Sequence, residues 1–79
     1  MSYWKYAVVK RKYEHETSYE IHELYFNEDN SLHAFTENGV APYGETKEEL
    51  FETLMMMLND CVDKEVYDYD ELSKQVGGK

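Results

Sequence analysis

The sequence predicts an α+β fold in which one amphipathic helix packs on one face of a three- or four-stranded antiparallel sheet. Two observations predict it: apolar and polar residues alternate in short segments of the first half, and a stretch with helical spacing follows a helix-start signal. With 79 residues, the chain has room for one modest core. We expect a single domain over residues 1–72 and a flexible tail over residues 73–79, because Gly77 and Gly78 have no side chain to anchor them.

Three strands are predicted before the helix. The first, over residues 3–13, places Trp4, Tyr6 and Val8 on one face and Lys5, Ala7, Val9 and Arg11 on the other. The second, over residues 18–27, places Tyr19, Ile21 and Tyr25 on one face and His22, Leu24 and Phe26 on the other. The third, over residues 32–37, follows the turn-forming residues 27–31 and therefore forms a hairpin with the second.

The helix begins at the clearest local signal in the chain, Thr46-Lys47-Glu48-Glu49. Thr46 can accept a hydrogen bond from the Glu49 backbone N–H while the Glu49 side chain reaches back to the Thr46 N–H, which makes a capping box. Apolar residues then fall on one stripe at helical spacing: Leu50, Phe51, Leu54, Leu58, Cys61 and Val62. Beyond the helix, Val66 and Tyr67 are the candidates for a short fourth strand, and we expect an irregular or single-turn segment over residues 68–72.

Charge and cysteine content exclude several classes of protein. The chain carries 17 acidic and 8 basic residues, for a formal net charge of −9, and an acidic body repels nucleic-acid phosphates. The basic run Lys10-Arg11-Lys12 is typical of a solvated strand end. Cys61 is the one cysteine, which excludes an internal disulfide and a Cys-based zinc site and suits a reducing cytosol. With no secretory signal and no apolar run long enough to span a bilayer, we expect a cytoplasmic protein.

The chain has no recognisable catalytic motif, and its candidate ligands are weak. Of its three histidines, His22 and His33 are able to meet across the hairpin, but two ligands without a third make a poor metal site. The acidic stretch over residues 60–71 lacks the glycine and glutamate of a calcium loop. Cys61 lies on the apolar helix stripe, where cysteine behaves as a small hydrophobe. We therefore expect no metal, no cofactor and no enzymatic activity.

The aromatic and apolar residues exceed what one helix can cover. Both faces of the predicted sheet carry apolar side chains, so the second face should be buried by self-association or by another protein. Met55, Met56 and Met57 follow one another around the helix, so at least one points away from the core, which indicates a contact surface. Eight tyrosines also suggest a base-stacking platform for RNA, which the net charge disfavours and which we rank last.

Three motifs follow one another along the chain: Tyr19-Glu20-Ile21-His22-Glu23-Leu24-Tyr25-Phe26-Asn27-Glu28-Asp29, Ala34-Phe35-Thr36-Glu37-Asn38 and Ala41-Pro42-Tyr43-Gly44-Glu45-Thr46-Lys47-Glu48-Glu49-Leu50. They resemble a group of short uncharacterised bacterial and phage proteins with the patterns Y-x-I-H-E-x-Y-Y-D-E-D and T-E-N-x-V-x-P-x-G-E-T-x-E-E-L. The likeness covers residues 3–70 and implies no particular activity. More loosely, three strands before Gly44-Glu45-Thr46 resemble the domain of HicB-type antitoxins, small acidic proteins that bind and block a basic RNA-cleaving toxin. The Pro-Gly-Cys turn of that domain is absent from this sequence.

The leading hypothesis is a non-enzymatic, acidic protein-binding module that uses its open sheet face and acidic surface and is able to act as a homodimer. The predicted contact residues are Tyr6, Tyr19, Tyr25 and His22, expected outside the helix-covered core, and Glu20, Glu23 and Glu37, expected to complement a basic partner. The alternative hypothesis is a phage-type acidic mimic of nucleic acid that inhibits a host DNA-binding protein. Salt separates the two, because mimicry predicts binding that weakens steeply with ionic strength and competes with DNA.

Overall fold

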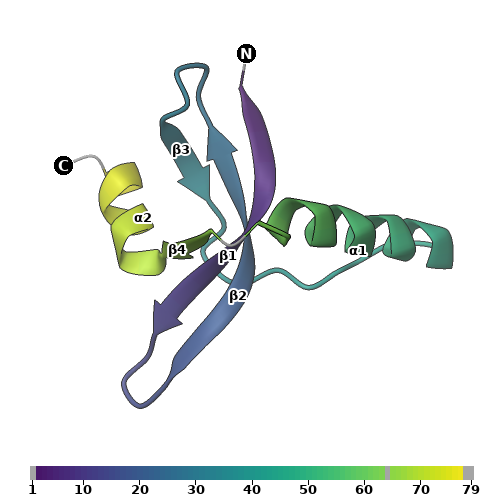
Figure 1. Ribbon diagram of the computed structural model, residues 1–79, viewed down its shortest axis with the longest axis horizontal. Coiled ribbons are helices and arrows are strands. Elements are labelled where there is room, and N and C mark those ends of the chain that lie inside the picture. Colours follow the sequence, from purple (N-terminus) through teal and green to yellow (C-terminus); the bar gives the residue numbers. More distant parts are fainter. Residues whose placement is uncertain (1, 64, 78–79) are drawn as a thin grey trace.

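A four-stranded mixed sheet forms the centre of the molecule in the computed structural model, which describes residues 2–63 and 65–77 (Figure 1). Strands β1 (Tyr3–Lys12) and β2 (Thr17–Phe26) pair antiparallel over ten residues, Tyr3 opposite Phe26 and Lys12 opposite Thr17. Strand β3 (Leu32–Phe35) pairs antiparallel with β2, and β4 (Val66–Asp68) pairs parallel with β1. The strand order is therefore β3-β2-β1-β4.

The parallel pairing of β4 corrects the prediction of a purely antiparallel sheet. A parallel neighbour needs a long crossover connection, and the chain between β3 and β4 supplies one, because it contains a complete helix. The predicted hairpin between β2 and β3 is confirmed. In the β2–β3 turn, Asn27 N–H donates to the Ser31 carbonyl over 2.8 Å. Asn30 adopts the left-handed conformation with φ 71°, which asparagine tolerates better than most residues.

A second helix, α2 (Tyr69–Gly77), covers one face of the sheet and was not predicted. Its Leu72 packs with Ala7 and Val9 of β1 and Leu24 of β2 to form the core. The Asp68 side chain starts the helix, since its Oδ1 accepts hydrogen bonds from the Asp70 N–H over 3.0 Å and the Glu71 N–H over 3.2 Å. The predicted domain boundary at residue 72 falls inside this helix, and residues 78 and 79 of the predicted tail lie outside the described residues.

The predicted helix, α1 (Lys47–Cys61), begins where its capping signal placed it. The Glu49 N–H donates to Thr46 Oγ1 over 3.1 Å, which confirms half of the capping box. The reciprocal bond goes one residue further back, because the Glu49 carboxylate accepts from the Glu45 N–H over 3.0 Å. These contacts satisfy N–H groups that would otherwise lack partners at the helix start.

The predicted helix was expected to pack its apolar stripe on one face of the sheet, whereas α1 packs against β1 with its C-terminal end. Figure 1 shows it projecting from the sheet on the side opposite α2. Its C-terminal end packs against β1, where Asp60 Oδ2 accepts the Tyr6 backbone N–H over 3.0 Å, and Met57 is its one buried residue. The apolar residues of α1 were expected to pack in the core, but α2 covers the main core instead. Phe51, Leu54 and Leu58 therefore remain exposed.

Candidate protein-binding surface

The sheet side opposite α2 carries a row of aromatic residues, which we call the aromatic face. It consists of four aromatic residues and the two residues between them on β2. The strand register places all six on the same side of β1 and β2: Trp4, Tyr6, Tyr19, Tyr25, Ile21 and Glu23. The Trp4 ring meets Tyr6 edge to face with centroids 5.1 Å apart and lies 6.4 Å from the Tyr25 centroid. Such mutual contacts hold large side chains in fixed positions before any partner arrives.

A single carboxylate organises the polar part of the aromatic face. The Tyr25 hydroxyl donates a hydrogen bond to Glu23, and this bond raises the pKa of Tyr25 because it favours the neutral phenol. Burial raises the pKa of Tyr6, and the nearby charges of Glu23 and Asp60 raise it further. Both phenols therefore stay protonated at neutral pH, and Glu23 is the anionic group of the face.

The aromatic face continues beyond this cluster in both directions. Tyr19, opposite Lys10 in the register, is one of the most exposed aromatic residues. At the other end, a shallow hollow is lined by Tyr3, Trp4, Tyr25, Phe26 and His33, together with Ser2 and Asn27. Trp4 was missed as a contact residue in the sequence, although its alternation with Tyr6 already placed it on this face.

His22 lies on the other side of the sheet, so its predicted place outside the helix-covered core is wrong. It is fully buried, because the alternation of β2 puts it on the same face as Leu24, beneath α2. Its Nδ1 lies 2.8 Å from the Thr36 carbonyl and its Nε2 lies 2.9 Å from Glu20 Oε1. The Tyr69 and Phe35 rings lie against the imidazole, with centroids 5.9 Å and 6.1 Å away. His22 is therefore a buried residue of the fold and not a contact residue for a partner.

Glu20 is engaged within the chain. Its Oε2 accepts hydrogen bonds from Ser18 Oγ and from the Tyr13 hydroxyl, both over 2.7 Å. The bonds from Ser18, Tyr13 and His22 lower the pKa of Glu20 to about 2. A carboxylate with three hydrogen-bond partners inside the chain gains little from a basic partner.

Glu37 is exposed at the end of β3, away from the aromatic face. Its backbone carbonyl accepts the Tyr69 hydroxyl over 3.1 Å and Arg11 Nη1 over 3.2 Å, and the Arg11 guanidinium stacks on the Tyr69 ring at 4.0 Å. Of the seven predicted contact residues, the structure thus brings Tyr6, Glu23 and Tyr25 together, with Tyr19 on the same face. His22 and Glu20 lie on the opposite face, and Tyr6 itself is buried.

The structure also places the cysteine and the residues that were considered as metal ligands. Burial raises the pKa of the Cys61 thiol, and the carboxylates of Asp60 and Asp63 raise it further, which keeps the sulfur protonated and weakly nucleophilic. Within residues 2–63 and 65–77, no three His, Cys, Asp or Glu side chains are grouped to hold a metal ion. Neither helix in this described part of the chain is long and apolar enough to cross a membrane.

Comparison of the chain with protein-family models, with curated proteins and with solved structures gave no match.

Proposed function

We propose that this chain is a non-enzymatic module that binds a basic protein through its aromatic face. The observation that carries the proposal is a sheet face on which Trp4 and Tyr19 are exposed and Tyr25 is partly buried. Tryptophan and tyrosine are enriched at interface hot spots, because they bury large apolar areas and still offer one polar atom. The loose resemblance to HicB-type antitoxins, which bind a basic toxin, implies a role of the same kind.

Charge supports a basic partner. The chain carries a net charge of −9, and Glu23 places one carboxylate within the aromatic cluster itself. Opposite charge accelerates encounter and disfavours acidic partners, while the aromatic contacts supply most of the affinity. Glu37 contributes to the long-range attraction only, because it lies apart from this cluster, and Glu20 and His22 act from within the fold.

A comparative capture experiment tests the proposal. The tagged wild type and two variants are incubated with nuclease-treated lysate of the organism that encodes the chain, and bound proteins are identified by mass spectrometry. Tyr19→Ala/Tyr25→Ala removes two aromatic contacts, whereas Tyr43→Ala removes an exposed tyrosine from the loop before α1 and serves as the matched control. We expect one basic protein that the double variant binds at least about tenfold more weakly, while the control binds normally. Equal binding by the wild type and both variants contradicts the proposal.

The second candidate function is the acidic mimic of nucleic acid. The observation that favours it is a run of exposed carboxylates at the free end of α1, namely Glu45, Glu48, Glu49 and Glu52. Mimicry predicts that affinity falls steeply between about 50 and 200 mM salt and that duplex DNA displaces the chain from its partner. Binding through the aromatic face predicts a weak salt dependence and no competition.

A further inference from the structure

The outer side of α1 is an apolar stripe that no other residue described by the structure covers. The stripe, which we call the arm stripe, consists of Leu50, Phe51, Leu54, Met55, Leu58 and Val62, all of them exposed. At 100° per residue, each lies within about 100° of Leu54 around the helix axis. Phe51 is 63% exposed, although phenylalanine is among the residue types that are most often buried.

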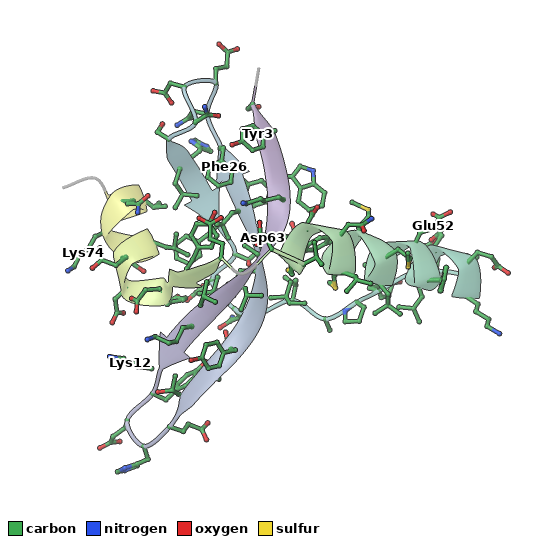
Figure 2. The ribbon with its side chains drawn as sticks, in the orientation of Figure 1. Tyr3, Lys12, Phe26, Glu52, Asp63 and Lys74 are labelled. Atoms are coloured by element: carbon green, nitrogen blue, oxygen red, sulfur yellow. The ribbon has the colours of Figure 1, made fainter. Side chains whose placement is uncertain are left out.

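The acidic side chains of α1 avoid the arm stripe. Glu48, Glu49, Glu52 and Asp60 each lie about 120° or more from Leu54 around the axis. Figure 2 shows Glu52 near the free end of the helix and Asp63 at its base beside the sheet. Two copies of α1 that meet stripe to stripe would therefore keep most of their carboxylates on their outer sides, despite the net charge of −9.

The chain exposes more surface than a compact monomer, and the excess is close to the area that one partner buries in a standard interface. The chain exposes 5974 Å², whereas a compact monomer of its 9.4 kDa mass exposes roughly 5,000 Å². Its radius of gyration is 13.4 Å, against roughly 11.6 Å for a compact chain of this length. The excess of about 1,000 Å² slightly exceeds the ~800 Å² that each partner buries in a standard interface.

We propose that a second copy of this chain covers the arm stripe, with the two α1 helices packed antiparallel about a twofold axis near Leu54. The inference goes beyond the proposed function, because it concerns α1 and not the aromatic face. A stripe that runs the length of α1 is self-complementary under twofold symmetry, which requires the same patch on both copies. In this register Leu50 of one copy meets Leu58 of the other.

Charge at the helix ends selects the antiparallel orientation. Lys47 starts α1 within about 20° of Leu54 around the axis and makes no ion pair with any residue that the structure describes. The last turn of α1 has no basic residue and contains Asp60, and Asp63 follows directly after the C-cap Val62. An antiparallel pair brings Lys47 of each copy to this negative end of the other, where the helix dipole also favours a cation. A parallel pair brings Lys47 to Lys47 and Asp63 to Asp63.

The same arrangement brings the second α1 close to the sheet of the first copy. Helix α1 spans about 22 Å from its base on β1 to its free end. With both helices fully overlapped, the first turn of the second α1 reaches the sheet beside the base of the first. Each copy therefore brings the first turn of its α1 close to the sheet of the other.

Sedimentation equilibrium between about 1 and 200 μM chain tests the association. We expect a wild-type mass near twice 9.4 kDa at the upper concentrations. Phe51→Glu/Leu58→Glu should weaken the dimer at least about 100-fold, because each substitution buries a charge in the contact. Met56→Glu is the matched control, since Met56 is equally an exposed apolar residue of α1 but lies about 160° from Leu54. Both variants should fold, because neither change touches the core.

Cysteine trapping tests the orientation. In a Cys61→Ser background, Leu54→Cys should form an intermolecular disulfide under mild oxidation, and Glu52→Cys should not. In the wild type the two Cys61 residues lie at opposite ends of the antiparallel pair, about 20 Å apart, and should not cross-link. Efficient cross-linking of the native Cys61 indicates a parallel pair and overturns the proposal.

The outcomes separate this inference from the proposed function. A wild-type mass of one chain at about 200 μM overturns the dimer, and so does a dimer that Phe51→Glu/Leu58→Glu leaves intact. The aromatic-face variants Tyr19→Ala/Tyr25→Ala still decide the proposed function in that case. If the dimer dissociates as expected and no basic protein is captured, the inference is supported and the proposed function is contradicted.

Discussion

Glu20 is the charged residue whose replacement should cost the fold most. Its pKa of about 2 lies below the usual value of 4.5, and each unit corresponds to about 1.4 kcal/mol, for an upper limit of about 3 kcal/mol. The side chain is 19% exposed, so solvent screening reduces this to about 2 kcal/mol. Glu20→Gln should therefore lower the free energy of unfolding at pH 7 by about 2 kcal/mol, because Ser18, Tyr13 and His22 lose their anionic partner.

The pH dependence of that loss identifies its cause. The folded pKa lies below the unfolded one, so the charge of Glu20 stabilises the fold fully above pH 4.5, and the effect is lost as pH falls toward 2. Urea unfolding, followed by the fluorescence of Trp4 at one chain concentration, measures wild type and variant across this range. Glu16→Gln is the control, an exposed glutamate in the adjoining turn. A difference between wild type and Glu20→Gln that stays constant from pH 7 to pH 2 refutes the reasoning.

Three further substitutions test the fold. Leu72→Ala opens a cavity between α2 and the sheet and should cost about 2 to 4 kcal/mol in urea unfolding; a loss below about 1 kcal/mol would contradict the role of α2 in the core. Thr46→Ala removes the cap of α1 and should cost about 1 kcal/mol and reduce the helical circular dichroism, whereas Thr46→Ser should leave both unchanged. Asp60→Ala leaves the Tyr6 N–H without its acceptor and should cost about 1 to 2 kcal/mol, with faster hydrogen exchange at that amide; unchanged exchange would count against the bond.

Local patterns predicted the local structure well. Trp4 and Tyr6 share one face of β1, and Tyr25 and Leu24 lie on opposite faces of β2, as the alternation within each strand predicted. The cap at Thr46 starts α1 at the predicted residue. Both signals depend on side chains a few residues apart, which is why the sequence alone contains them.

Non-local packing accounts for the errors. No pattern in Val66 and Tyr67 states which strand they pair with, so the parallel partner β1 could not be predicted. The stripe of α1 looks like a core stripe, since an apolar helix face has the same sequence whether its own sheet or another chain covers it. Helix α2 was missed although Asp68 is a good capping residue. His22 was misplaced as a consequence, because α2 is the helix that covers its side of the sheet.

The most direct test of whether a second copy covers the arm stripe is the oxidation of three consecutive methionines by dilute hydrogen peroxide, resolved by tandem mass spectrometry. In the single chain Met55 is 42% exposed, Met56 46% and Met57 5%, so Met55 and Met56 should oxidise alike unless something covers one of them. If a second copy covers the arm stripe, concentrated wild type will oxidise at Met56 while Met55 is protected, and Phe51→Glu/Leu58→Glu will restore equal rates. Equal oxidation of Met55 and Met56 in the concentrated wild type would contradict a covered stripe.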